Sequence, residues 1–156
     1  MDFTPLFQPK TIAVVGVSLS DNRHPANVIY NKIHLRSDIK VYPVNPRGGM
    51  LQADRVYKDI DSIPHRIDLA VIAARAEYVP DIVKSCIRSR VGGATIISGG
   101  FAETGNRDLQ DQIVAIAREA EFPFIGPNCL GIYVPNRFDT FFLPGERLVR
   151  PQAGNV

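Results

Sequence analysis

The feature that most constrains the fold is a short apolar run that ends in a glycine and precedes a helix-forming stretch. Residues 12–15 read Ile-Ala-Val-Val, and such runs suit a strand that is covered on both faces of a parallel sheet. Gly16 frees the backbone for a tight turn, and a helix is predicted from Pro25 because proline suits the first helical turn. Between the strand and the helix, backbone N–H groups and the helix N-terminus form a place for a phosphate. The pattern therefore predicts a nucleotide-type ligand at the carboxyl end of a parallel sheet.

The same alternation of apolar runs and helical stretches continues along the chain. Apolar residues recur at helical spacing after Val79 and again from about residue 107 to 121. Further strands are predicted at residues 40–44, 69–73, 94–97 and 124–125. Strands that alternate with helices specify an α/β fold, here a single Rossmann-like domain with a doubly wound parallel sheet and right-handed crossovers. The loops after the five strands then meet at one edge of the sheet, where ligands bind in this architecture.

Some stretches lie outside this alternation. Residues 1–10 are expected to form an arm packed on the domain. Residues 50–59 are interpreted as an irregular crossing with a short element near Val56, and residues 60–63 as one helical turn. Residues 132–156 contain aromatic residues and prolines but no further strand–helix unit.

Composition and charge exclude several classes of protein. Hydrophobic residues make up 45% of the 156-residue chain, which argues against disorder, and the net charge of +2 with scattered basic residues argues against a nucleic-acid partner. The start of the chain lacks a signal peptide, and no apolar stretch is long enough to span a bilayer. Two cysteines do not make a disulfide framework. We therefore expect a soluble protein of the reduced cytoplasm that makes no contact with a membrane.

Two common nucleotide motifs are absent. A nicotinamide dinucleotide site needs three glycines in GxGxxG and an acidic residue after the second strand. Only Gly16 fits that fingerprint, and the second strand ends in Asn45 instead of a carboxylate. A P-loop is excluded because no GKS or GKT follows a glycine loop.

Five motifs occur in an order that is typical of one family. They are Val14-Val15-Gly16-Val17-Ser18, Val41-Tyr42-Pro43-Val44-Asn45-Pro46, Asp68-Leu69-Ala70-Val71-Ile72, Ser98-Gly99-Gly100-Phe101-Ala102-Glu103 and Gly126-Pro127-Asn128-Cys129-Leu130-Gly131. This set resembles the CoA-binding domain of ADP-forming (NDP-forming) acyl-CoA synthetases, which are related to the succinyl-CoA synthetase α subunit. The resemblance covers nearly the whole chain. It departs from the family at Val17, where alanine is usual, and in the loop of residues 21–25, which lacks the family's lysine and glycine.

The resemblance implies a cofactor, a domain boundary and a function shared with further domains. It implies coenzyme A as the cofactor, held by a domain at residues 1–135, with residues 136–156 as an extension towards a further domain. In such proteins an acyl group passes between the CoA thiol and an acyl phosphate, and the energy of the thioester is conserved as ATP when the thiol is released. A phosphohistidine domain and an ATP-grasp region, in the same protein or a partner subunit, do that chemistry, so no catalytic residue and no metal ligand is expected here. Homo-oligomerisation stays open.

Two alternatives remain beside the synthetase. One is a regulatory CoA-binding module of a protein lysine acetyltransferase, since similar domains occur there. The other is a redox sensor or dehydrogenase that binds a dinucleotide, against which the missing carboxylate after the second strand argues.

The glycine turn and the loop after it are the expected pyrophosphate site. Gly16, Ser18 and Ser20 are expected to meet the pyrophosphate through backbone N–H groups and hydroxyls, although a turn glycine and a helix-capping serine would explain the first two equally simply. Arg23 either binds the 3′-phosphate of CoA, since a guanidinium suits phosphate, or is an exposed loop residue. His24 is expected to pack before Pro25.

The loops after the second and third strands are expected to contact the rest of the nucleotide. Val44, Asn45 and Pro46 are predicted to line the adenine and ribose pocket, with a plain turn as the alternative. After the third strand, Ala73 and Ala74 leave room for a ligand. Arg75 is either a phosphate partner or a solvated residue.

The remaining loops are expected to lie along the pantetheine arm. Ser98, Gly99 and Gly100 resemble the family's loop against that arm, although glycines also suit a turn of any purpose. Asn128 corresponds to the thiol end. Cys129 follows it, but no His or Asp is adjacent in sequence to activate a nucleophile, and the resemblance gives it no catalytic role.

Overall fold

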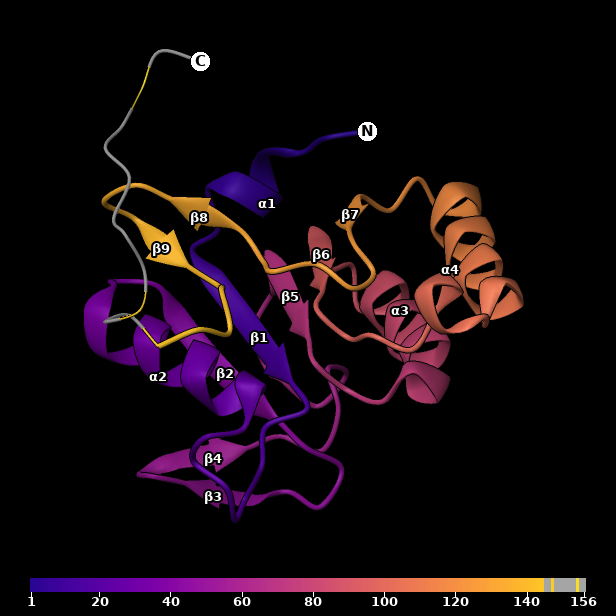
Figure 1. The fold of residues 1–156 in the computed structure, drawn as a ribbon. Helices are drawn as coiled ribbons and strands as arrows, with labels where there is room; N and C mark the ends of the chain where they lie inside the picture. The colour runs from indigo at the N-terminus through magenta and orange to yellow at the C-terminus, as the bar shows by residue number, and fades with distance from the viewer. Residues whose placement is uncertain (145–146, 148–153, 155–156) are drawn as a thin grey trace.

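A five-stranded parallel sheet forms the centre of the computed structural model, which describes residues 1–144, 147 and 154 (Figure 1). In spatial order its strands are β2 (Lys40–Val44), β1 (Thr11–Val15), β5 (Leu69–Ile72), β6 (Gly93–Ile96) and β7 (Phe124–Ile125). The long helices are α2 (Pro25–Arg36), α3 (Val79–Arg88) and α4 (Arg107–Glu119), with 3-10 turns η1 (Ala76–Tyr78) and η2 (Ala102–Thr104) before the last two. The predicted α/β, Rossmann-like sheet is confirmed.

The strand order places a switch point next to β1. The chain passes from β1 to β2 on one side and then returns to β5 on the other side, where β6 and β7 follow. The register is continuous across β2, β1 and β5, since Val15 is paired with both Val44 and Ile72. In open sheets a ligand binds in the crevice outside the carboxyl ends at such a point. The loops after β1 and β5 flank that crevice.

Alternate residues of the central strands divide the core into two halves. Ile12 and Val14 face α2, where Ile29 and Tyr30 are buried. The intervening residues of β1 face α3 and α4. This alternation explains why the strands read as continuous apolar runs, because a parallel sheet is covered on both faces.

The prediction of an irregular crossing at residues 50–59 is wrong, whereas the short element expected near Val56 is observed. Residues 49–56 form an antiparallel hairpin of β3 (Gly49–Leu51) and β4 (Asp54–Val56) instead of an irregular crossing. Tertiary contacts hold it, since the Tyr30 hydroxyl donates a hydrogen bond to Asp54 and His34 lies 3.3 Å from the same carboxylate. Residues 60–63 form a single turn in which Ile63 N–H donates to Ile60 O at 3.1 Å.

The outer edge of β2 is partly covered by the residue that follows β4. Tyr57 N–H donates to Pro43 O at 2.9 Å, and Asn45 N–H donates to Tyr57 O at 2.9 Å. Pro43 therefore faces this outer edge, because the N and O of one strand residue point to the same side.

Both ends of the described chain pack on the domain. The short helix α1 (Thr4–Phe7) buries Leu6, and a side chain on Gly92 or Gly93 would collide with α1. A second hairpin, β8 (Tyr133–Val134) and β9 (Phe138–Asp139), lies against α2. Among the described residues, none of the helices is long and apolar enough to cross a membrane.

Candidate functional site

The loops after β1, β2 and β5 touch at the carboxyl edge of the sheet. Gly16 N–H donates to Val44 O at 2.9 Å, and Ala73 N–H donates to Val15 O at 2.9 Å. Gly16 has a φ of +101°, and a Cβ there would lie 2.5 Å from the carbonyl oxygen of Ala73. Only glycine allows this approach, because the angle and the space both exclude a side chain.

The buried amide of Asn27 holds the loop after β1. Ser18 N–H donates to Asn27 Oδ1 at 2.6 Å, and Asn27 Nδ2 donates back to Ser18 O at 2.8 Å. Ser18 Oγ accepts from the backbone N–H of Asp21 at 2.9 Å and of Ser20 at 3.3 Å. The Ser18 backbone N–H is thus used within the protein, and its hydroxyl keeps a proton to donate to a ligand.

Asn27 is absent from the residues that the sequence indicated. The feature of the sequence that could have indicated Asn27 is its position, because it lies three residues before the buried Tyr30 on the inward face of α2. A polar side chain on such a face needs an internal partner, and the loop backbone provides it.

The loop between Ser18 and α2 exposes its two charged residues, Asp21 and Arg23. His24 caps α2 by accepting the Ala26 N–H at 3.3 Å, which agrees with its expected packing before Pro25. The Arg23 side chain is 97% exposed, and its Nε lies 4.0 Å from Asp21. Ser20 is exposed as well.

The turn after β2 is held by the amide of Asn45. Asn45 Nδ2 donates to Val17 O at 2.7 Å, and Asn45 Oδ1 accepts the Arg47 N–H at 2.8 Å. Val44 is buried in the core, whereas Pro46 is exposed. The amide therefore joins this turn to the β1 loop, and the proline ring is the face that a ligand can reach.

The loop after β5 has small side chains near the sheet and a charged side chain further out. Ala73 and Ala74 are half-buried. Arg75 is 80% exposed, with Nη1 4.0 Å from Glu77 Oε1. The two alanines thus leave the crevice open, and Arg75 extends into solvent.

The loops after β6 and β7 contact each other at the same edge. Asn128 N–H donates to the carbonyl oxygen of the buried Ser98 at 2.9 Å, and a Cβ on Gly99 would lie 3.4 Å from Asn128 Oδ1. Glu103 Oε1 accepts from the N–H of Gly100 at 2.5 Å and of Phe101 at 3.2 Å. The Gly100 hydrogen bond holds the pKa of Glu103 below its usual value. Ser98, Gly99, Gly100 and Asn128 are thus brought together, as the sequence predicts for one ligand arm.

Cys129 points beneath this edge. Its Sγ lies 3.4 Å from Thr95 Oγ1 and donates to Ile96 O at 3.3 Å. The thiol is therefore engaged with β6. Among the described residues no group of three His, Cys, Asp or Glu side chains could hold a metal ion.

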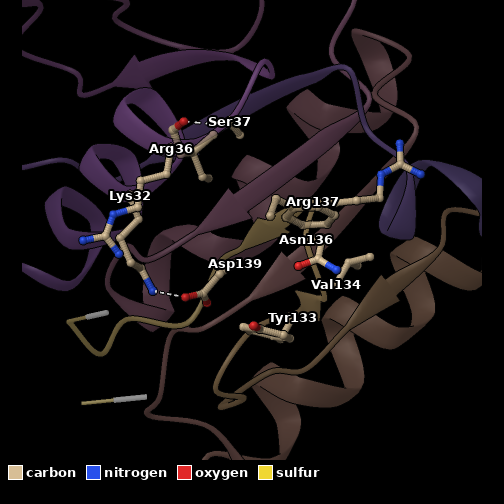
Figure 2. A pocket seen from close by; sticks show the side chains of 10 residues that line it. Lys32, Arg36, Ser37, Tyr133, Val134, Asn136, Arg137 and Asp139 are labelled. Carbon is tan, nitrogen blue, oxygen red and sulfur yellow. Dashed lines mark hydrogen bonds and ion pairs between the residues drawn. The ribbon is translucent and has the colours of Figure 1, made fainter. Parts of the chain in front are cut away.

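A hollow of about 490 Å³ lies where the end of α2 meets Asn136 and Arg137, and two smaller hollows lie beside it and beside the turn after β2. One of about 270 Å³ follows the turn after β2 and is lined by three basic residues, Arg47, Arg55 and Lys58, together with Gly48, Gly49, Val56, Asp59 and Ser62. The other, of about 230 Å³, lies between the end of α2 and the β8–β9 hairpin (Figure 2). The hollow beside the turn after β2 adjoins the predicted nucleotide loops, and the sequence interpretation missed it because it treated residues 50–59 as irregular.

Comparison with known proteins agrees with this arrangement. A family model described as a CoA binding domain matches residues 10–135. The alpha subunit of acetate–CoA ligase (ADP-forming) I from Pyrococcus furiosus is 34% identical over 160 residues, which cover 98% of this chain and 35% of that protein. Acetate–CoA ligase (ADP-forming) from Methanocaldococcus jannaschii is 36% identical over 124 residues, 80% of this chain and 17% of that protein.

A solved structure of an acetyl-coenzyme A synthetase is also similar to this chain. The dinucleotide-forming acetyl-coenzyme A synthetase 1 of Ca. Korarchaeum cryptofilum, in complex with phosphate and ADP, is similar with a TM-score of 0.84 and 32% identity, over 92% of this chain and 31% of that chain. The present chain thus spans about a third or less of these relatives. The sheet order, the loops at its carboxyl edge and the match over residues 10–135 together show that this chain belongs to the CoA-binding domain family, as the homologue of that domain in ADP-forming acetyl-CoA synthetases.

Proposed function

We propose that the domain binds CoA along the carboxyl edge of the sheet and holds its thiol for acyl transfer by further domains. The observation that carries this proposal is the contact between Gly16 and Ala73, which joins the loops on both sides of the switch point. Such a crevice accepts a phosphate-containing ligand, because backbone and small residues leave room for it.

The residues divide into those that reach the ligand and those that shape the edge. Ser20, Pro46, Gly99 and Asn128 are exposed and Ala74 is half-buried, so we assign them to direct contact, together with the Ser18 hydroxyl. Gly16, Val44, Asn45, Ala73, Ser98 and Gly100 shape the edge from beneath. Arg23 and Arg75 remain candidate phosphate partners, since both side chains are exposed at this edge.

The chemistry of the whole protein follows from the relatives as a proposal. The CoA thiol would lose its proton and its sulfur would attack the carbonyl carbon of an acyl phosphate, so that a thioester forms and phosphate leaves. The domain would position the thiol, and a phosphohistidine domain and an ATP-grasp region would form the acyl phosphate. A domain at residues 1–135 with an extension at 136–156, possible homo-oligomerisation and a cytoplasmic location remain predictions, the last supported by free thiols at Cys86 and Cys129.

The test is calorimetry of the chain with CoA, ADP and NAD. CoA should bind more tightly than NAD, because Asn45 uses its amide within the protein where a dinucleotide site would present a carboxylate. Tighter binding of NAD would overturn the proposal.

A charge placed in the loop sharpens the test. Ser20→Glu puts a carboxylate beside the proposed pyrophosphate and should weaken CoA binding about tenfold or more. Gln112→Glu adds the same charge on the exposed face of α4 and should leave the affinity unchanged. Equal affinities for the two variants would place the ligand elsewhere.

A further inference from the structure

We propose that the β3–β4 hairpin completes a site for a phosphate monoester, formed by Arg47, Arg55 and Lys58. These side chains line the hollow of about 270 Å³ beside the turn after β2. The inference rests on the proposed function, because the monoester would be the 3′-phosphate of CoA. Dephospho-CoA lacks that group, so the site would decide between the two ligands.

The hollow lies next to the predicted nucleotide loops. Arg47 directly follows Pro46, and Gly48 N–H donates to Asn45 O at 2.8 Å, which closes the turn. A Cβ on Gly49 would lie 3.9 Å from Leu19 Cδ1, so the rim of the hollow adjoins the loop after β1. In CoA the 3′-phosphate and the 5′-diphosphate are attached to the same ribose. A ligand with its pyrophosphate at the β1 loop can therefore direct its monoester into this hollow.

The basic side chains are supported by their surroundings. The Lys58 stem packs on Gly48, since a Cβ there would lie 3.4 Å from Lys58 Cγ. The guanidinium of Arg55 lies over the Tyr57 ring, 5.2 Å from its centroid. Such packing restricts the side chains before a ligand arrives, which lowers the entropic cost of binding.

The charge balance of the hollow favours an anion. Among the described residues, no carboxylate lies within 4 Å of the charged groups of Arg47, Arg55 or Lys58. The one acidic lining residue, Asp59, accepts the Ser62 N–H at 2.8 Å. Three cations against one carboxylate attract a phosphate dianion, and guanidinium groups bind it with paired hydrogen bonds.

This site competes with the assignment of the 3′-phosphate to Arg23. Arg23 offers one guanidinium, 97% exposed and next to Asp21, whereas the hollow offers three cations from two elements. Arg47, Arg55 and Lys58 are exposed as well, so the advantage of the hollow lies in the number of its cations.

The experiment measures CoA and dephospho-CoA binding by calorimetry for Arg55→Gln, Lys58→Gln and the double variant. Each single change should lower CoA affinity about 5- to 30-fold, because it removes a charged hydrogen bond, and leave dephospho-CoA within about twofold. The exposed Lys84→Gln on α3 is the matched control and should change the affinity for neither ligand. Arg23→Gln tests the competing assignment and should change CoA and dephospho-CoA binding to the same extent. Thermal unfolding of each variant checks the fold.

Three results would overturn the proposal. They are equal losses for both ligands, no loss in the double variant, and a CoA-specific loss confined to Arg23→Gln. Absence of CoA binding by the unaltered chain would instead defeat the proposed function. In that case the affinities of the chain for adenosine 3′,5′-bisphosphate and for ADP would be compared. Absence of a preference for the bisphosphate would overturn the proposed phosphate site as well.

Discussion

The two ends of α2 are joined to the rest of the molecule by different chemistry. At its start, the neutral amide of Asn27 holds the β1 loop through two hydrogen bonds with Ser18. In its second half, Lys32 is 8% exposed and its ammonium donates to Asp139 Oδ2 at 2.7 Å (Figure 2). The same ammonium donates to Leu143 O at 3.0 Å and to Phe141 O. Burial lowers the pKa of Lys32, and Asp139 opposes that effect.

The difference follows from what each end has to do. A buried charge beside the ligand loops would compete with the phosphates of CoA, whereas neutral amides fix the loops without adding charge. The other end has only to hold the segment from β8 to Leu143, and there a buried lysine collects three acceptors from that segment. The ligand edge should therefore be sensitive to shape and hydrogen bonding, and the other end to charge.

The largest effect should come from the shape of the ligand edge. Gly16→Ala combines left-handed backbone strain of about 1–2 kcal/mol with overpacking of about 1–3 kcal/mol, so it should cost about 4 kcal/mol of unfolding free energy in urea. Gly105→Ala is the matched control, because Gly105 has a φ of +92° but nothing within 4 Å of a Cβ. It should cost only the strain. Equal losses in both variants would mean that the approach to Ala73 is unimportant.

The next effect tests the charge at the other end of α2. Asp139→Ala leaves the buried Lys32 with only backbone acceptors and should cost about 3 kcal/mol, the low end for a broken buried pair. Asp81→Ala removes the exposed partner of Lys84 and should cost under about 0.5 kcal/mol. Chemical denaturation measures both. A small loss for Asp139→Ala would remove the contrast between the two ends.

A third change breaks the amide contact at the ligand edge. Asn27→Ala removes two hydrogen bonds of about 1 kcal/mol each, so stability should fall by about 2 kcal/mol. CoA binding should also weaken, because the β1 loop loses its support. Asn31→Ala on the same helix removes only a surface hydrogen bond from Gln52 and should have little effect. Unchanged CoA affinity in Asn27→Ala would show that the loop does not need this amide.

The smallest expected effect comes from removing the charge of the partly exposed Asp61. Arg88, Ser89 and Ser85 donate hydrogen bonds to Asp61, and the Arg88 contact above all lowers the pKa of this carboxyl. A lowered pKa gives stability that is present above about pH 4 and is lost as the pH falls through the folded value. Asp61→Asn should thus cost under about 1 kcal/mol at pH 7, since the group is partly exposed, and the difference should shrink below pH 4.

Urea titrations at several pH values check this prediction. Asp111→Asn, at an exposed position of α4, is the control and should follow the unaltered protein at every pH. A gap between Asp61→Asn and the unaltered protein that stays constant with pH would assign the effect to packing.

Most of the sheet could be predicted from the sequence, because apolar runs and helical spacing are local signals. The strand predicted at residues 94–97 is observed at Gly93–Ile96, and the helix from Pro25 begins as expected. The β3–β4 hairpin could not be predicted from its own sequence pattern, because contacts from Tyr30 and His34 of α2 to Asp54 hold it in place.

The candidate site divides in the same way. The family motifs identified the loops at the carboxyl edge, and the structure brings those loops together. The motifs could not show that Asn45 turns its amide towards Val17, nor that Lys58 lies beside Arg47. Those facts depend on residues that meet only after folding, and Lys32 and Asp139, 107 positions apart, are the extreme case.

The outer edge of β2 has a consequence for the behaviour of the protein in a crowded solution. An open strand edge is a template on which another chain can add a strand and start aggregation. Here one of the outward-facing residues is Pro43, which has no donor, and its carbonyl oxygen is already bound by Tyr57. A further strand could therefore not pair along the Pro43 end of β2 without first displacing Tyr57, so this part of the border resists fibril-like association.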